Sequence, residues 1–184
     1  MTRLDPIPPR ELDPEQTALY RSITEGPRAQ GPQHFQLTRD DGALLGPFNA
    51  LLLSPALGAA LQEVGAAVRY RTALTPRTRE IAILIVAAHW DSSFERSAHE
   101  SVGRAVGLTE TELADIRAGG VPQLEDAHED ACAHVVHAMV NGDVDDHTWT
   151  TWGGTVGNAT VFELTTLVGY YATLALQMRV FRVH

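Results

Sequence analysis

The sequence has 184 residues and no lysine, so every basic side chain in it is an arginine. Without lysine, the chain can neither form a Schiff base with a carbonyl substrate nor hold pyridoxal phosphate through one. Basic residues are also few, because 14 of them stand against 23 acidic residues and the net charge is −9. Since no basic run interrupts this acidic balance, we expect no nucleic-acid partner.

Cysteine and apolar leader segments are scarce as well. The single cysteine, Cys132, excludes an internal disulfide, and the N-terminal stretch MTRLDPIPPRELDPEQ contains no apolar signal region. The apolar stretch near the C-terminus is interrupted by Glu163, Gln177 and Arg179, which argues against a membrane span. We therefore expect a cytoplasmic protein without a membrane partner.

Alternating β patterns are absent, and helical periods run through most of the chain. We expect one all-α domain over residues 1–184, with an N-terminal helix and long loop in 1–45 and a helical core in 46–184. Capping signals mark helix starts at Asp13 with Gln16, at Thr109 with Glu112, and at Thr160 with Glu163. The predicted helices cover about 14–24, 46–53, 55–70, 75–88, 94–106, 110–118, 123–140, 146–156 and 160–181.

Two of these segments bear on the shape of the domain. Residues 26–46 contain glycines and two prolines without any sustained period, and a loop of that length in a compact domain is usually functional or packed over a neighbour. In the helix predicted for 55–70, Leu57, Leu61, Val64 and Val68 have the spacing of a core-facing stripe.

The stretch from Thr75 to Gly107 holds most of the chemistry. Thr75 and Pro76 open a helix, and no polar residue occurs from Ile81 to Ala88, which is typical of a helix buried on all sides. Glu80 therefore lies at the edge of the core, where burial raises a carboxyl pKa. The alternative is a first-turn carboxylate that interacts with the helix dipole and pairs with Arg77 or Arg79.

A second helix follows from about Phe94 to Val106. Glu95 and His99 stand one helical turn apart and head the same stripe as Val102 and Val106, so a carboxylate and an imidazole face the core together. This pattern indicates an acid–base pair. The alternatives are an exposed ion pair of adjacent turns and a core histidine satisfied by its neighbour.

Other polar groups are weaker candidates. His89, Trp90 and Ser92 flank the junction between the two helices, where they are candidates for substrate binding or simply cap and pack. His128 and Cys132 share one face of the helix at 123–140, whereas His134 and His137 point away from it. Because these side chains cannot converge from one helix, we expect no metal site.

Several spaced motifs together resemble the carboxymuconolactone decarboxylase family, which includes the alkylhydroperoxidase D-type proteins. They are L-x-P-R-x-R-E-I-A-I-L from Leu74, F-E-x-x-x-H from Phe94, a following Gly107-Leu108, and the upstream stretch Gly46–Gly58. The resemblance covers roughly Gly42 to Tyr171. It implies an all-α helical bundle of the alkylhydroperoxidase D-like type in a homo-oligomer, a dimer, trimer or hexamer, with the site near a subunit boundary.

The resemblance also implies a chemistry. In the peroxidase branch two cysteines precede the histidine, but Ser92 and Glu95 stand at those positions here, so a dithiol mechanism lacks its nucleophile. The decarboxylase-like branch implies cofactor-free decarboxylation of a small carboxylated lactone or related acid. We expect Glu80, Glu95 and His99 to be catalytic.

For the substrate we expect a small carboxylic acid or lactone. Arg77 and Arg79 are candidates to hold its carboxylate, because a guanidinium fork matches a carboxylate. Two alternatives stay open. One is a hydrolase, an isomerase or a peroxidase-like oxidoreductase on the same fold, and the other is a non-catalytic, ligand-binding helical oligomer.

Overall fold

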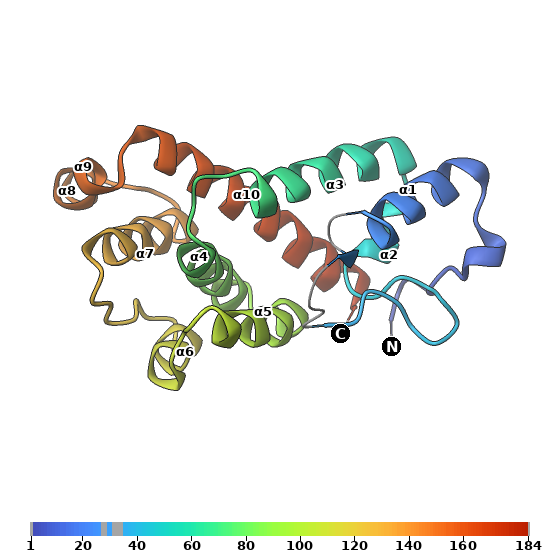
Figure 1. Ribbon diagram of the computed structural model, residues 1–184, viewed down its shortest axis with the longest axis horizontal. Helices are drawn as coiled ribbons and strands as arrows, with labels where there is room; N and C mark the ends of the chain where they lie inside the picture. The colour runs from blue at the N-terminus through green and yellow to red at the C-terminus, as the bar shows by residue number, and fades with distance from the viewer. Residues whose placement is uncertain (1, 27–28, 31–34, 184) are drawn as a thin grey trace.

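The computed structural model describes residues 2–26, 29–30 and 35–183, and its regular elements are helices (Figure 1). Within these residues the only β-type pairing is an isolated bridge between Thr38 and Leu44. The all-α prediction is confirmed. The elements are η1 (Pro9–Glu11), α1 (Pro14–Thr24), α2 (Phe48–Leu51), α3 (Pro55–Tyr70), α4 (Pro76–His89), α5 (Ser93–Ala105), α6 (Glu110–Arg117), α7 (Ala127–Val140), α8 (Asp146–Thr148), the π-helix η3 (Trp149–Gly153), α9 (Gly154–Val156) and α10 (Asn158–Phe181).

Two of the three predicted capping residues lie at the start of a helix and form both hydrogen bonds of a capping box. Asp13 caps α1 and forms the predicted reciprocal pair with Gln16, and Thr109 does the same with Glu112 at α6. The prediction is wrong at α10, which begins at Asn158 after Gly157. There the Glu163 carboxylate instead accepts hydrogen bonds from the backbone N–H of Ala73, at 3.0 and 3.1 Å.

Helix α4 lies at the centre of the larger hydrophobic cluster, with α5, α7 and α10 packed around it (Figure 1). Its residues from Ile81 to Ala87 are all buried, as the apolar run predicts. Other helices enclose α4 on several sides. A polar side chain on its first turns is therefore buried together with the apolar ones. Glu80 occupies such a position.

The predicted core stripe of α3 is wrong at two positions. Leu57 is 68% exposed and Val64 is 39% exposed, while Gly58 and Gly65 face the interior. The glycines permit close packing, because a Cβ at Gly65 would lie 2.2 Å from the hydroxyl oxygen of Tyr170 on α10. Helix α3 thus approaches its neighbours through its smallest residues and leaves larger apolar side chains outside.

Helix α10 is the only described helix long and apolar enough to cross a membrane by length and composition. A core helix passes the same test, and α10 packs against α3, α4 and α7. Its buried side is formed by Leu164, Leu167, Tyr170, Tyr171, Leu174, Ala175 and Met178. Tyr170 and Tyr171 bring this helix to the site described below.

A second hydrophobic cluster joins α1 and α2 to the loop between them. It contains Leu19 and Ile23, both predicted to face inward, and the loop residue Leu44, while Phe35 packs against it. Parts of the loop, residues 27–28 and 31–34 with Pro27 and Pro32, lie outside the described residues. The described part carries Phe35 to the interior, next to α5.

Candidate acid–base site

A buried, hydrogen-bonded glutamate–histidine pair between α4 and α5 forms the centre of the site. Oε2 of Glu80 lies 2.6 Å from Nδ1 of His99, and the two residues are only 1% and 4% exposed. Glu80 comes from the first turns of α4 and His99 from the second turn of α5. Since α4 and α5 make the most extensive helix–helix contact of the described residues, their packing fixes the carboxylate against the ring.

Glu80 is held as a carboxylate despite its burial. Burial alone would raise its pKa, but the charge and hydrogen bond of His99, together with Arg69 and Arg79, hold the pKa below its usual value. An ionised Glu80 accepts a hydrogen bond from Nδ1–H of His99. That tautomer makes Nε2 the basic nitrogen of the ring.

Glu95 is the opposite case. It is 2% exposed, and neither of its carboxyl oxygens has a hydrogen-bond partner among the described residues. Burial raises the pKa of Glu95 to about 8, and the nearby hydroxyl of Ser92 opposes this rise. At neutral pH Glu95 is therefore mostly protonated. Glu95 does not fix the tautomer of His99, because Glu80 occupies the position at Nδ1.

Glu95 and His99 line the same small cavity, of about 20 Å³, which is room for one water molecule. Its other walls are apolar or aromatic side chains: Phe35, Pro47, Phe48, Phe94, Ala98, Tyr170, Tyr171 and Leu174. The ring of Tyr171 meets His99 edge to face at 5.2 Å, and Phe35 lies 6.4 Å from the same imidazole. An acid and a base thus face one small cavity with mainly aromatic walls.

Of the residues predicted to bind substrate, some lie at this site and others lie elsewhere on the protein. Arg79 lies beside the pair, with Nε 3.9 Å from Oε1 of Glu80, and Ser92 is buried beside Glu95. His89 is exposed. Trp90 packs against Arg179, whose guanidinium lies over the indole ring at 5.4 Å. Neither His89 nor Trp90 lines the cavity of Glu95 and His99.

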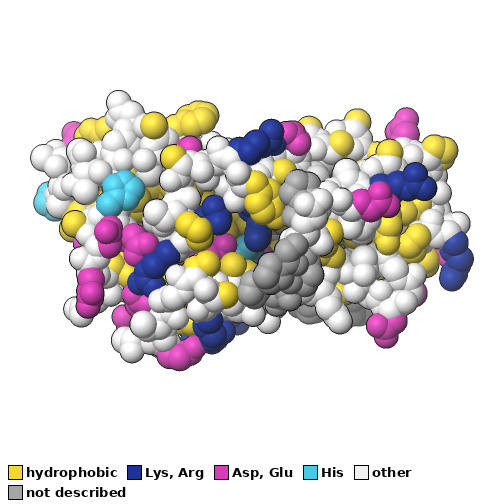
Figure 2. Space-filling view, viewed as in Figure 1, with side chains coloured by type: hydrophobic (Ala, Val, Ile, Leu, Met, Phe, Trp, Pro, Cys, Tyr) yellow, Lys and Arg dark blue, Asp and Glu magenta, His cyan; other side chains and the backbone are white. Residues whose placement is uncertain are grey.

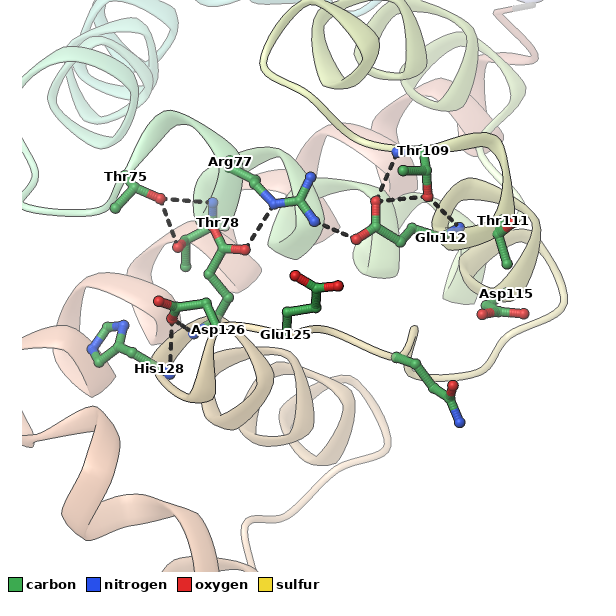
Figure 3. Close-up of a pocket in the computed structure, with 12 residues that line it drawn as sticks. Thr75, Arg77, Thr78, Thr109, Thr111, Glu112, Asp115, Glu125, Asp126 and His128 are labelled. Carbon is green, nitrogen blue, oxygen red and sulfur yellow. Dashed lines mark hydrogen bonds and ion pairs between the residues drawn. The ribbon is translucent and has the colours of Figure 1, made fainter.

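Arg77 belongs to a different and much larger hollow, a cleft of about 850 Å³ between α4, α6 and α7 (Figure 3). Its guanidinium is already bound by Glu112, by Glu129 at 2.8 Å and by the carbonyl of Gly107 at 2.5 Å. Figure 2 shows acidic side chains gathered around arginine on this side of the molecule.

Three polar residues of the cleft act as helix caps. Thr75, Thr109 and Asp126 cap α4, α6 and α7 there. Five carboxylates and one arginine line the cleft, so it would repel an anionic substrate. Its residues are Thr75, Arg77, Thr78, Thr109, Thr111, Glu112, Asp115, Gln123, Glu125, Asp126, His128 and Glu129.

Three residues of the site were not predicted from the sequence. Arg69 interacts electrostatically with Glu80 and Tyr171, Tyr171 contacts His99, and Phe35 covers the cavity. For Arg69 a signal existed, because it follows Gln62 and Gly65 at helical spacing on the buried side of α3. Phe35 lies in a segment without period, and nothing in the sequence places it near His99.

Thiol chemistry has no support at this site. Cys132 is buried on α7, and burial, with Glu129 and Asp126, raises the pKa of its thiol to about 12. The α7 histidines have other contacts: His134 stacks on Trp152 at 4.3 Å, and His137 lies 3.1 Å from the carbonyl of Gly119. Among the residues that the structure describes, no group of histidine, cysteine and acidic side chains has the arrangement of a metal site.

Comparison with known proteins agrees with this picture. No curated protein matches the chain. A family profile, that of the carboxymuconolactone decarboxylase family, matches residues 55–138. The matched segment runs from the start of α3 into α7 and includes Glu80, Glu95 and His99. Over this segment, which is less than half of the chain, the sequence is similar to the carboxymuconolactone decarboxylase family.

Proposed function

We propose that this protein is a cofactor-independent lyase that removes CO₂ from a small carboxylated lactone or a related acid. The observation that carries the proposal is the pairing of a protonated Glu95 with a basic His99 on one buried cavity. Similarity to a family that includes decarboxylases supports the reaction class. Acid–base catalysis needs one group that gives a proton and one that takes it, and here the two are distinct residues.

The reaction breaks the bond between the substrate carbon and its carboxylate. The electron pair of that bond passes through the conjugated system to the lactone carbonyl oxygen, and CO₂ leaves. Glu95 then gives its proton to the carbanionic carbon, and the electron pair returns to form the new C–H bond. His99, oriented by Glu80, takes a proton from solvent at Nε2 and passes it to the Glu95 carboxylate, so the net reaction consumes one solvent proton and releases CO₂.

The surroundings favour this sequence of steps. A carboxylate transferred from water to an aromatic, dry cavity loses hydration, whereas CO₂ is neutral and needs none. Of the two arginines predicted to hold a substrate carboxylate, Arg79 lies next to Glu80, whereas Arg77 is engaged in the acidic cleft. We assign the substrate-binding role to Arg79.

Replacement of His99 tests the proposal. On a panel of carboxylated unsaturated lactones, His99→Asn should release CO₂ about 10² to 10⁴ times more slowly than the parent and retain its fold. His147→Asn, at an exposed position of α8, is the matched control and should keep parental turnover. A folded His99→Asn protein with parental kcat would contradict the assignment. Isomerised or hydrolysed products without CO₂ would indicate another reaction on the same fold.

The non-catalytic alternative, a ligand-binding helical oligomer, needs as much space for its ligand as the enzyme does. The cavity of about 20 Å³ is too small for any lactone unless a wall moves. The unpartnered carboxyl group of Glu95 counts against it, because a purely structural core gains nothing from a buried acid without a hydrogen bond. Saturable lactone binding without turnover on the whole panel would support the alternative.

We also propose that the protein is a homo-oligomer. Large apolar side chains are exposed on α3 and on α10, which pack against each other. They are Leu57, Val64 and Tyr70 on α3 and Phe162, Leu176 and Val180 on α10. Large exposed apolar side chains on two neighbouring helices are candidates for an interface between subunits. Light scattering at the monomer mass over a range of concentrations would refute this.

A further inference from the structure

Two arginines share a single carboxylate in the interior. Arg69, from the last turn of α3, and Arg79, from the first turn of α4, both act electrostatically on Glu80. Nε and Nη1 of Arg69 and Nε of Arg79 are buried without a hydrogen-bond partner among the described residues. Buried guanidinium donors are rarely left in that state, because each lost hydrogen bond to water must be replaced.

The charges around Glu80 do not balance. Arg69 and Arg79 contribute two positive charges and Glu80 one negative charge, which leaves one positive charge when His99 is neutral and two when it is protonated. Glu95 cannot compensate, since it is mostly protonated at neutral pH. No aspartate or glutamate occurs among the residues outside the described ranges. An uncompensated positive charge in the interior is energetically costly, and a bound anion would neutralise it.

Arg69 also stays charged. Burial opposes its ionised form, but Tyr171, Glu80 and Tyr70 act against burial, and the pKa of Arg69 is raised above its ordinary value. The hydroxyl of Tyr171 is a hydrogen-bond partner of Arg69, and the ring of Tyr171 contacts His99. Arg69 is therefore connected to the catalytic histidine on two sides, through Tyr171 and through Glu80.

We infer that Arg69 and Arg79 form a subsite for one singly charged oxyanion, a carboxylate of the ligand, beside the Glu80–His99 pair. The assignment to a substrate rests on the proposed function. A planar carboxylate accepts from two guanidinium groups in the geometry of its lone pairs. One such group neutralises the excess charge of one, whereas a doubly charged phosphate would overcompensate it.

The subsite borders the surface. The Arg79 side chain is 17% exposed, and Arg69 is partly exposed. A ligand entering from this side meets the guanidinium donors before it reaches the imidazole. The arginines would thus hold the anionic end of the ligand and orient the remainder toward His99.

Acetate is the probe for this subsite. We expect sodium acetate, compared with sodium chloride at equal ionic strength, to raise the Tm of the native protein and to saturate. Arg69→Met should weaken acetate binding, measured by calorimetry, by about 10- to 100-fold, the worth of a hydrogen bond to a charged group. Arg71→Met is the matched control: Arg71 lies two residues away, is 57% exposed and pairs with Glu63, so this variant should bind acetate as the parent does.

If Arg69→Met does not fold, the Arg79→Gln variant tests the subsite independently through the same acetate measurement. It leaves Arg69 balanced by Glu80, so acetate stabilisation should fall in the same way. His99→Asn should lose turnover and keep acetate binding, which separates failure of the subsite from failure of the proposed chemistry. The inference would be overturned if the parent, Arg69→Met and Arg79→Gln bound acetate equally well. It would also be overturned if acetate had no effect beyond that of chloride. The two arginines would then be structural partners of Glu80.

Discussion

Replacement of Glu95 by glutamine should make the protein more stable and less active. In the unfolded chain a glutamate loses its proton near pH 4.5, whereas folded Glu95 keeps it to about pH 8. Between these values the folded state binds one more proton than the unfolded state, so the contribution of Glu95 to stability falls as the pH rises and levels off above pH 8. Glutamine has nearly the same shape and does not ionise, so Glu95→Gln removes this cost.

The size of the effect follows from the shift. Each unit between pH 4.5 and pH 8 costs about 1.4 kcal/mol, so the penalty is about 1 kcal/mol at pH 5, about 3 kcal/mol at pH 7 and about 4 kcal/mol at pH 8. Glu95→Gln should therefore gain about 3 kcal/mol of stability over the parent between pH 5 and pH 8. For a domain of this size that corresponds to a difference in Tm on the order of 10 °C.

Urea unfolding at pH 5, 7 and 8 measures the effect directly, provided that parent and variant have equal m-values. Glu63→Gln is the control, because Glu63 is 69% exposed and its ion pair with Arg71 is worth little at any of these pH values. If Glu95→Gln were equally stabilising or destabilising at pH 5 and at pH 8, Glu95 would be ionised in the folded protein, and its role as proton donor would be refuted.

Two further predictions concern the thiol and the cavity wall. Cys132→Ser should leave turnover within a few-fold of the parent, because the thiol is buried away from the site, and loss of turnover on this change or on thiol alkylation would restore the peroxidase alternative. Phe35→Ala should enlarge the cavity enough to bind benzene, which a benzene-dependent rise in Tm would report, whereas Phe162→Ala, at a site 73% exposed, should show no such rise. If benzene did not raise the Tm of Phe35→Ala, the prediction would be wrong, and the cavity walls would have collapsed into the space left by the phenyl ring.

The sequence was sufficient to predict the helices and the side of each helix that carries the chemistry. Capping residues and an uninterrupted apolar run are local signals, and they placed α1, α4, α5 and α6 within a few residues of their bounds. Burial of Glu80, Glu95 and His99 followed from their spacing on two helices. Helical periodicity states which face a side chain occupies, so it could predict burial but not the partner met there.

The sequence could not predict which side chains on different helices contact each other. Spacing suggested Glu95 as the partner of His99, since the two are adjacent on one helix, but the packing of α4 against α5 brings Glu80 to Nδ1 instead. The same limit explains why Arg69 and Tyr171 were missed, because they reach the site from α3 and α10. On α3 the apolar residues Leu57 and Val64 were expected inside, but close helix packing selected the glycines.

The site combines two carboxyl groups of the same residue type in opposite protonation states. Glu80 is surrounded by Arg69, Arg79 and His99 and stays ionised, whereas Glu95 faces aromatic rings and stays protonated. Charges fixed in this way before a ligand arrives need no reorganisation during the reaction. What the site lacks is space, because ligand pockets usually measure about 300–1,000 Å³ and this cavity measures about 20 Å³.

A ligand must therefore displace part of the wall, and the walls differ in how firmly they are held. Phe48, Tyr170 and Tyr171 belong to helices and are buried in the two hydrophobic clusters. Phe94 is confined by Gly46, where even a Cβ would lie 2.3 Å from its ring. Phe35 is only partly buried and comes from a segment without helix, so displacing it breaks no helical hydrogen bond. The energetic cost of admitting a substrate should therefore fall mainly on Phe35, while the residues that carry the charges keep their positions.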